Sequence, residues 1–145
     1  MTSMVSAAVA AIVVALNSGT PVASQIARVR LRPVAQTQAQ AVVVRAVQSD
    51  VAEAALIPGL PVSWASVIQV ECYARSVASI ATDVAVDALV ESVYTRLMAD
   101  PTLGGVVLSL QPQSIHWDFD ADGEQTTCAT LSFIARHRSV GATLS

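Results

Sequence analysis

The sequence predicts a single α+β domain over residues 1–145, with an antiparallel-dominated mixed sheet of about five strands and two helices packed on one face. Two stretches repeat apolar residues at helical spacing, four others alternate apolar and polar residues with period two, and one is a run of β-branched residues. No repeat of 20 to 50 residues and no low-complexity linker divides the chain. The expected order of elements is α-β-β-β-α-β-β.

The first segment predicts a helix over residues 2–16. Gly19 and Pro21 follow it as stop signals, because Gly accepts the backbone conformation of a helix C-cap and Pro does not continue a helix. Residues 26–32 then alternate strictly, which predicts a half-buried strand. The apolar face of the helix consists of Val5, Val9, Ile12 and Leu16.

The middle of the chain predicts two more strands. Residues 41–47 are rich in β-branched side chains and predict a buried strand. Residues 48–61 contain Pro58-Gly59 and Pro61 and are expected to form a loop. A long strand follows over 62–74. One side of it carries Trp64, Ile68, Val70 and Cys72, and the other carries Gln69, Glu71 and Tyr73.

A second helix is expected over residues 82–99, with Thr82 as its N-cap. Residues 113–120 and 126–137 then predict a β-hairpin whose turn is Asp120–Gly123, since Asp-Gly favours tight turns. The helix has an apolar face of Val86, Val90, Val93 and Leu97, and a solvated face of Asp83, Asp87 and Glu91. The hairpin residues expected to face the core are Ile115, Trp117, Phe119, Leu131, Phe133 and Ala135.

The composition limits the possible functions. The chain is 53% hydrophobic and only 13% charged, so part of its surface is expected to be covered by other subunits. The most apolar stretch, Met4–Leu16, is shorter than the about 20 residues of a membrane-spanning helix. A net charge of −3 and few aromatic residues argue against specific nucleic-acid recognition. Cys72 and Cys128 have no metal-ligand spacing and are expected to be buried free thiols.

Two patterns resemble functional motifs, one a calcium loop and the other part of a hydrolase site, and neither motif is complete. Asp118-x-Asp120-x-Asp122-Gly123 copies the start of a calcium loop, but its twelfth position is Ala129 instead of the bidentate Glu. We therefore expect a hairpin turn and no bound metal. His116 and Asp118 share one strand face, which leaves a serine hydrolase as an alternative. There is no phosphate-binding glycine loop and no cofactor motif, so no cofactor is expected.

The basic residues are all arginines and form two groups. Arg28, Arg30 and Arg32 would stand in a row about 7 Å apart along the predicted strand. Such a row either faces solvent or forks carboxylates of an adjoining subunit, or a passing phosphate backbone. We take the three as candidate subunit-interface residues. Arg136-His137-Arg138 forms a smaller second cluster.

Three stretches together resemble the small tail terminators of long-tailed bacteriophages. They are Glu71-Cys72-Tyr73-Ala74-Arg75 at the end of a strand, DALVESVYTRLMADPTLGG from Asp87 to Gly105, and IHWDFDADGEQTTCATLSFIARHRS from Ile115 to Ser139. With the Leu31-Arg32-Pro33 run after the first strand, the resemblance covers most of the chain. None of these stretches is a catalytic signature.

The resemblance implies a structural role in the virion, after assembly in the host cytoplasm. Such proteins are not enzymes. They form a hexameric ring on the tail tube protein, stop tube polymerisation and present a surface to the head connector or stopper protein, while DNA passes through the channel. The alternatives are another neck protein (stopper or head-completion), the small hydrolase of His116 and Asp118, and a cytoplasmic dimeric binding module.

Overall fold

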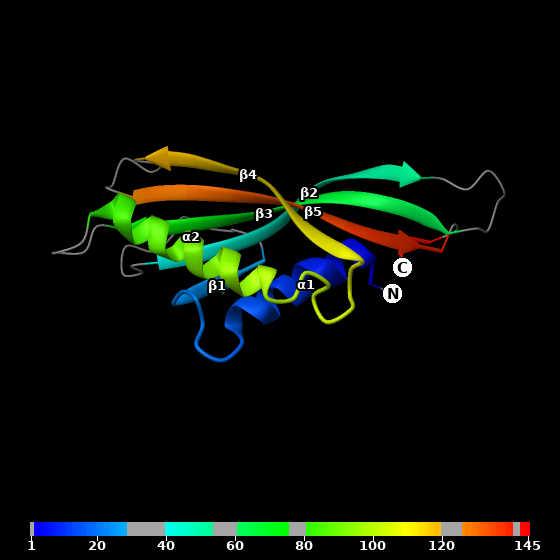
Figure 1. Cartoon of the computed structure of the whole chain (residues 1–145), viewed down its shortest axis with the longest axis horizontal. Coiled ribbons are helices and arrows are strands. Elements are labelled where there is room, and N and C mark those ends of the chain that lie inside the picture. Colours follow the sequence, from blue (N-terminus) through cyan, green and yellow to red (C-terminus); the bar gives the residue numbers. More distant parts are fainter. Residues whose placement is uncertain (1, 29–39, 54–60, 76–80, 120–125, 141–142) are drawn as a thin grey trace.

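The computed structural model describes residues 2–28, 40–53, 61–75, 81–119, 126–140 and 143–145. The five strands form one twisted sheet in the order β1-β2-β3-β5-β4, and only the β1–β2 pair is parallel. Both helices lie on the same face of this sheet (Figure 1). The predicted α+β class and element order are confirmed. In chain order the elements are α1 (Met4–Asn17), β1 (Gln25–Ala27), β2 (Gln40–Glu53), β3 (Val62–Arg75), α2 (Thr82–Met98), β4 (Ser109–Phe119) and β5 (Thr126–Ser139).

The main core fills the space between the helices and the sheet. The apolar face predicted for α2 is fully buried, and α1 buries all of its predicted face except half-buried Val5. Within residues 68–74 of β3 and 129–135 of β5 every second residue enters this core, as period two requires. The largest fully buried side chains include Phe133, Ile12, Leu16, Ile68, Leu97 and Leu131.

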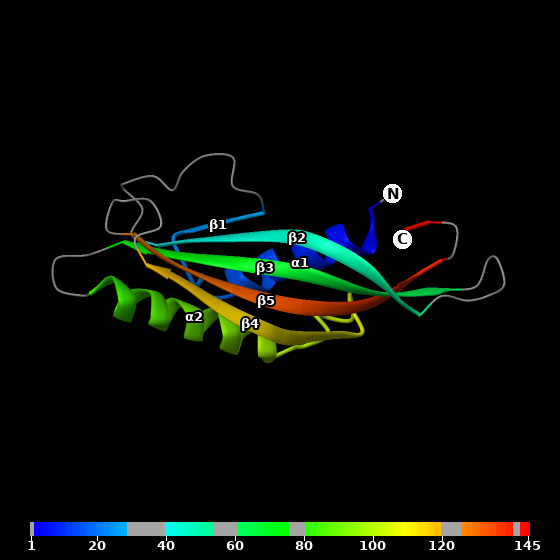
Figure 2. The ribbon, with the colours of Figure 1, turned by 90° about the horizontal axis from the view of Figure 1, so that it is seen from above.

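The opposite face of the sheet is largely polar and carries one small apolar cluster. Tyr73 and Cys128 are cross-strand partners there and pack with Ala41 and Val43. Around this cluster, Glu71 accepts a hydrogen bond from the Tyr73 hydroxyl (2.8 Å) and pairs with Arg45 (3.1 Å). Figure 2 looks onto this face, with α1 behind the sheet. The burial of Tyr73 was not predicted, because only the other side of the 62–74 strand was expected to be apolar.

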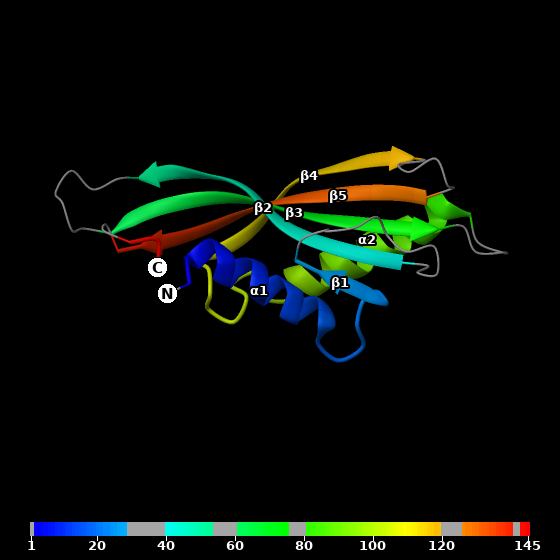
Figure 3. The same cartoon turned by 180° about the vertical axis from the view of Figure 1, so that it is seen from behind.

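At one end the sheet continues past the helices as a three-stranded extension, which we call the distal arm (residues 48–53, 62–67 and 134–139; Figures 1 and 3). The prediction of a loop over 48–61 is wrong for residues 48–53, because their backbone pairs with Ser63–Val67 of β3. Their polar side chains suggested a loop. Polar side chains suit a strand here, because no helix covers this part of β2 and Arg45 to Ala52 are solvent-exposed. Residues 54–60 lie outside the described part.

Several boundaries differ from the prediction. The strand predicted over 26–32 is confirmed at Ile26 and Ala27 and wrong at Arg28, whose side chain bonds Ser6 of α1. Residues 29–32 lie outside the described part. The helix predicted to be capped by Thr82 has Ala81 at its N-cap, with no side-chain hydrogen bond at the cap. The first hairpin strand begins earlier than predicted, because Ser109 of β4 pairs with Arg136 of β5. The second ends later than predicted, because Arg138 and Ser139 of β5 pair with β3. The Asp120–Gly123 turn lies outside the described residues.

Arg96 joins the two helices, and we expect its removal to be costly. Its guanidinium donates hydrogen bonds to the carbonyls of Ala15 (3.2 Å), Ser18 and Thr20 (3.0 Å), at the end of α1 where carbonyls have no helical partner. Arg96→Ala should lower the free energy of unfolding by about 1.5–3 kcal/mol, as for hydrogen bonds from a charged group. Urea unfolding measures this, with exposed Arg136→Ala as the control. Equal midpoints for the two variants would contradict the prediction.

Candidate subunit-interface surfaces

The predicted arginine row is only partly described by the structure. Arg28 lies just after β1 and is exposed, and its guanidinium donates to the Oγ (2.8 Å) and the carbonyl oxygen (3.3 Å) of Ser6 on α1. Arg30 and Arg32 lie outside the described residues. A role of the three arginines in subunit pairing therefore stays a prediction.

Strand β4 is the most exposed strand of the sheet. It ends the strand order, and Gln111 to Asp118 are exposed on both faces. A bulge at Gln113 lies between the Pro112–Phe133 and Ser114–Ser132 pairs. After the bulge, Ile115 and Trp117 face the helix side as predicted, opposite Leu131 and Ala129.

The prediction that Ile115 and Trp117 are core residues is wrong, because they are 44% and 39% exposed. The strand lies at the border of the sheet, where the helices do not cover it. The side chain of Phe119 lies outside the described residues. Two large apolar side chains on an exposed border strand are typical of a surface that another chain covers.

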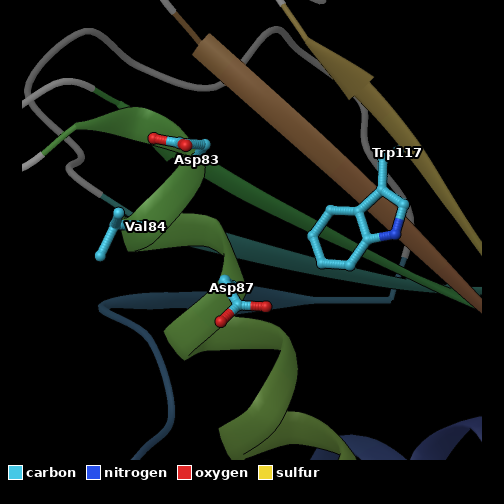
Figure 4. A pocket seen from close by; sticks show the side chains of 4 residues that line it. All are labelled: Asp83, Val84, Asp87 and Trp117. Carbon is cyan, nitrogen blue, oxygen red and sulfur yellow. The ribbon is translucent and has the colours of Figure 1, made fainter.

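A hollow of ≈ 460 Å³ lies between β4 and the start of α2, lined by Asp83, Val84, Asp87 and Trp117. Figure 4 shows the Trp117 indole extending from the sheet toward the two α2 turns that carry the carboxylates. Asp83 and Asp87 are neighbours at i and i+4 on the helix and are both exposed. Neither forms an ion pair within the described part of the chain. We call this the acidic hollow. Its acids were predicted to be a solvated helix face, and only the register of β4 places Trp117 opposite them.

The distal arm carries a polar network on its helix-side face and cations on the other. Ser66 Oγ lies 2.7 Å from both Ser49 Oγ and His137 Nε2, and Ser66 and His137 are almost fully buried. Burial lowers the pKa of His137. Among the described residues its Nδ1 has no hydrogen-bond partner. Arg136 and Arg138 flank it in sequence, point to the opposite face and are exposed.

The residues considered for hydrolysis do not assemble into a nucleophilic set within the described part. His116 and Asp118 lie on one face of β4, as predicted, opposite Thr130 and Cys128, and both are exposed. The serine that contacts a histidine there is Ser66, beside His137. Ser66 is 0% exposed, so a substrate has no access to its hydroxyl.

The cysteines and acidic residues were also considered as metal ligands. Cys72 and Cys128 are buried free thiols, as predicted, and burial raises the pKa of both. Among the described residues no group of three His, Cys, Asp or Glu is placed to hold a metal ion. Asp118 of the calcium-like motif is described, whereas Asp120 and Asp122 are not. No helix in the described ranges has the length and apolarity to cross a membrane.

Fold and surface together define an α+β protein with an open sheet border and two unlike exposed ends. No protein-family model and no curated protein matches the sequence. Among solved structures, the chain is similar to a chain in the "Virion of native gene transfer agent (GTA) particle". The two share 12% sequence identity at a TM-score of 0.53, and the match covers 90% of this chain and 94% of that chain. The shared property is the fold.

Proposed function

We propose that this chain is a structural virion protein that forms a ring at the head-proximal end of a phage-type tail tube. There it stops tube polymerisation and joins the tail to the head connector or stopper protein. The observation that carries the proposal is the match of nearly the whole fold to a chain of a virion particle. The likeness of residues 71–75, 87–105 and 115–139 to tail terminators supports the finer assignment.

The distribution of exposed groups suits the head-to-tail contact that a ring requires. One end of the molecule carries the acidic hollow and the border strand β4, and the other end carries the distal arm with its two arginines. Unlike patches at opposite ends can join head to tail, and such contacts close into a ring when the rotation between neighbours allows it. Two copies that pair both patches mutually would instead form a two-fold dimer, and the mass of the assembly distinguishes the two. Six subunits are the number that the resemblance implies.

The test is tail length in particles made without this protein. If the chain terminates tubes, its gene deletion should yield overlong tubes without heads, measured by negative-stain electron microscopy. Expression of the wild-type chain from a plasmid should restore a single tail length. Normal tails on filled heads would refute the proposal. Tails of normal length that fail to join heads would refute termination and favour the other candidate, a stopper or head-completion protein.

A non-enzymatic role is part of the proposal. The described residues place no nucleophile beside His116 and Asp118, and the hydroxyl that does contact a histidine, Ser66 Oγ, is buried. Arg28, Arg30 and Arg32 remain proposed contributors to subunit pairing. The described environment of Arg28 includes Ser6, so this residue also anchors the chain after β1 to α1.

A further inference from the structure

We propose that the acidic hollow of one copy receives Arg136 and Arg138 of the next copy, and that this pairing is the head-to-tail contact of the assembly. The inference deepens the proposed function by naming the contact, and therefore rests on it. It begins with two sets of charged side chains that are unpaired within the described part of each chain.

The acidic hollow has the chemistry of an arginine-binding site. Asp83 and Asp87 are like charges one helical turn apart, an arrangement that destabilises a helix slightly unless a cation lies between them. Trp117, across the hollow, is 39% exposed and offers an indole ring. A guanidinium binds carboxylates through two parallel hydrogen bonds and stacks on an indole ring. The ammonium group of lysine is a point charge and cannot form the same bidentate pair.

The distal arm presents matching cations. Arg136 and Arg138 lie two residues apart on β5, so their side chains leave the same face of the sheet about 7 Å apart. Two acidic residues of β2 are in register with these arginines: Asp50 with Arg136 across Ala65, and Glu53 with Arg138 across Ser63. Asp50 accepts two hydrogen bonds from Gln48 Nε2 (2.8 and 2.9 Å), and the side chain of Glu53 lies outside the described part. No ion pair of either arginine is found in the described part of the chain. The guanidinium N–H groups of Arg136 and Arg138 are therefore available to another chain.

The positions of the two groups exclude pairing within one chain. The hollow lies at the start of α2, and the arginines lie near the end of β5, at opposite ends of the molecule (Figure 1). Contact between a hollow and an arm therefore needs two copies. Each copy offers one hollow and one arm, so the contact can repeat head to tail, and a ring forms where the rotation between neighbours closes.

Charge reversal tests the pairing. D83K/D87K leaves cations on both sides of the contact, and R136E/R138E leaves anions on both sides, so each should weaken association about 100-fold. The variant with all four reversals restores opposite charges and should assemble again. Oligomer mass by analytical ultracentrifugation and incorporation into particles are the readouts, with circular dichroism melting as the check of folding. Normal assembly of either double variant, or failure of the folded quadruple variant, would overturn the pairing.

A cysteine pair separates this inference from the proposed function. In particles carrying D87C/R138C, a bismaleimide crosslinker as long as an Asp–Arg pair should give a ladder of covalent oligomers on a denaturing gel, since a direct disulfide cannot span that separation. D87C or R138C alone should give none. A missing ladder, in particles whose tails depend on the protein for their length, sinks the contact and leaves termination intact. A ladder in particles whose tails are normal without the protein keeps the contact and refutes termination.

Discussion

Phe133→Ala is expected to lower the free energy of unfolding by about 3–5 kcal/mol, the cost of truncating a fully buried aromatic side chain. Phe133 is 0% exposed at the middle of β5, where it is the cross-strand partner of Ile68 and Pro112. It enters the core from the central part of the sheet, so its removal leaves a cavity lined by residues from the helices and the sheet. Urea unfolding followed by circular dichroism measures the loss.

The matched control for this prediction is Ile115→Ala on the neighbouring strand β4. Ile115 faces the helix side of the sheet but is 44% exposed, so its truncation should change the free energy of unfolding by only about 0.5 kcal/mol. If the two variants unfold at the same urea concentration, the assignment of the core to β5 instead of β4 is wrong. A selective effect of Ile115→Ala on assembly would support β4 as a covered surface.

His137→Ala is the second large effect and depends on pH. The substitution removes the imidazole beside Ser66 Oγ and leaves a small cavity in the distal arm. We expect a loss of about 2 kcal/mol in the free energy of unfolding at pH 8. The same variant should also remove part of the acid sensitivity of the protein, since burial lowers the pKa of His137 in the folded state.

The sign of the acid effect follows from proton binding. With a lowered pKa in the folded state, the unfolded chain takes up the proton first as the pH falls below the ordinary histidine value of 6.5. The contribution of neutral His137 to the free energy of unfolding is therefore complete above pH 6.5, and it is lost as the pH falls below this value. Unfolding of wild type and His137→Ala between pH 8 and 5 measures the difference, with exposed His116→Ala as the second-histidine control. Parallel curves for wild type and His137→Ala would contradict the assignment.

Period-two and helical patterns predicted most of the fold. The apolar face of α2, most of that of α1, and the alternation of β3 and β5 were predicted correctly, because each depends on neighbours within one element. The pairing of β4 with β5 was also predicted, because the two strands are adjacent in the sequence. The boundaries were predicted less well. Polar residues 48–53 were assigned to a loop, although backbone pairing with β3 holds them in a strand. The side chains of Ile115 and Trp117 were assigned to the core, although they lie at the sheet border.

The candidate interface was predictable only in part. Sequence reasoning noted Arg136 and Arg138 as a cluster and Asp83 and Asp87 as a helix face, but nothing in the spacing relates Trp117 to α2. The bulge at Gln113 and the strand order bring that indole to the helix, from a strand far along the chain. By itself the sequence determined the element types, the α+β class and the apolar stripes of the core, since these follow from local periodicity. The tertiary structure alone decided which stripes are covered and which charges are left without partners, because burial depends on where distant elements end.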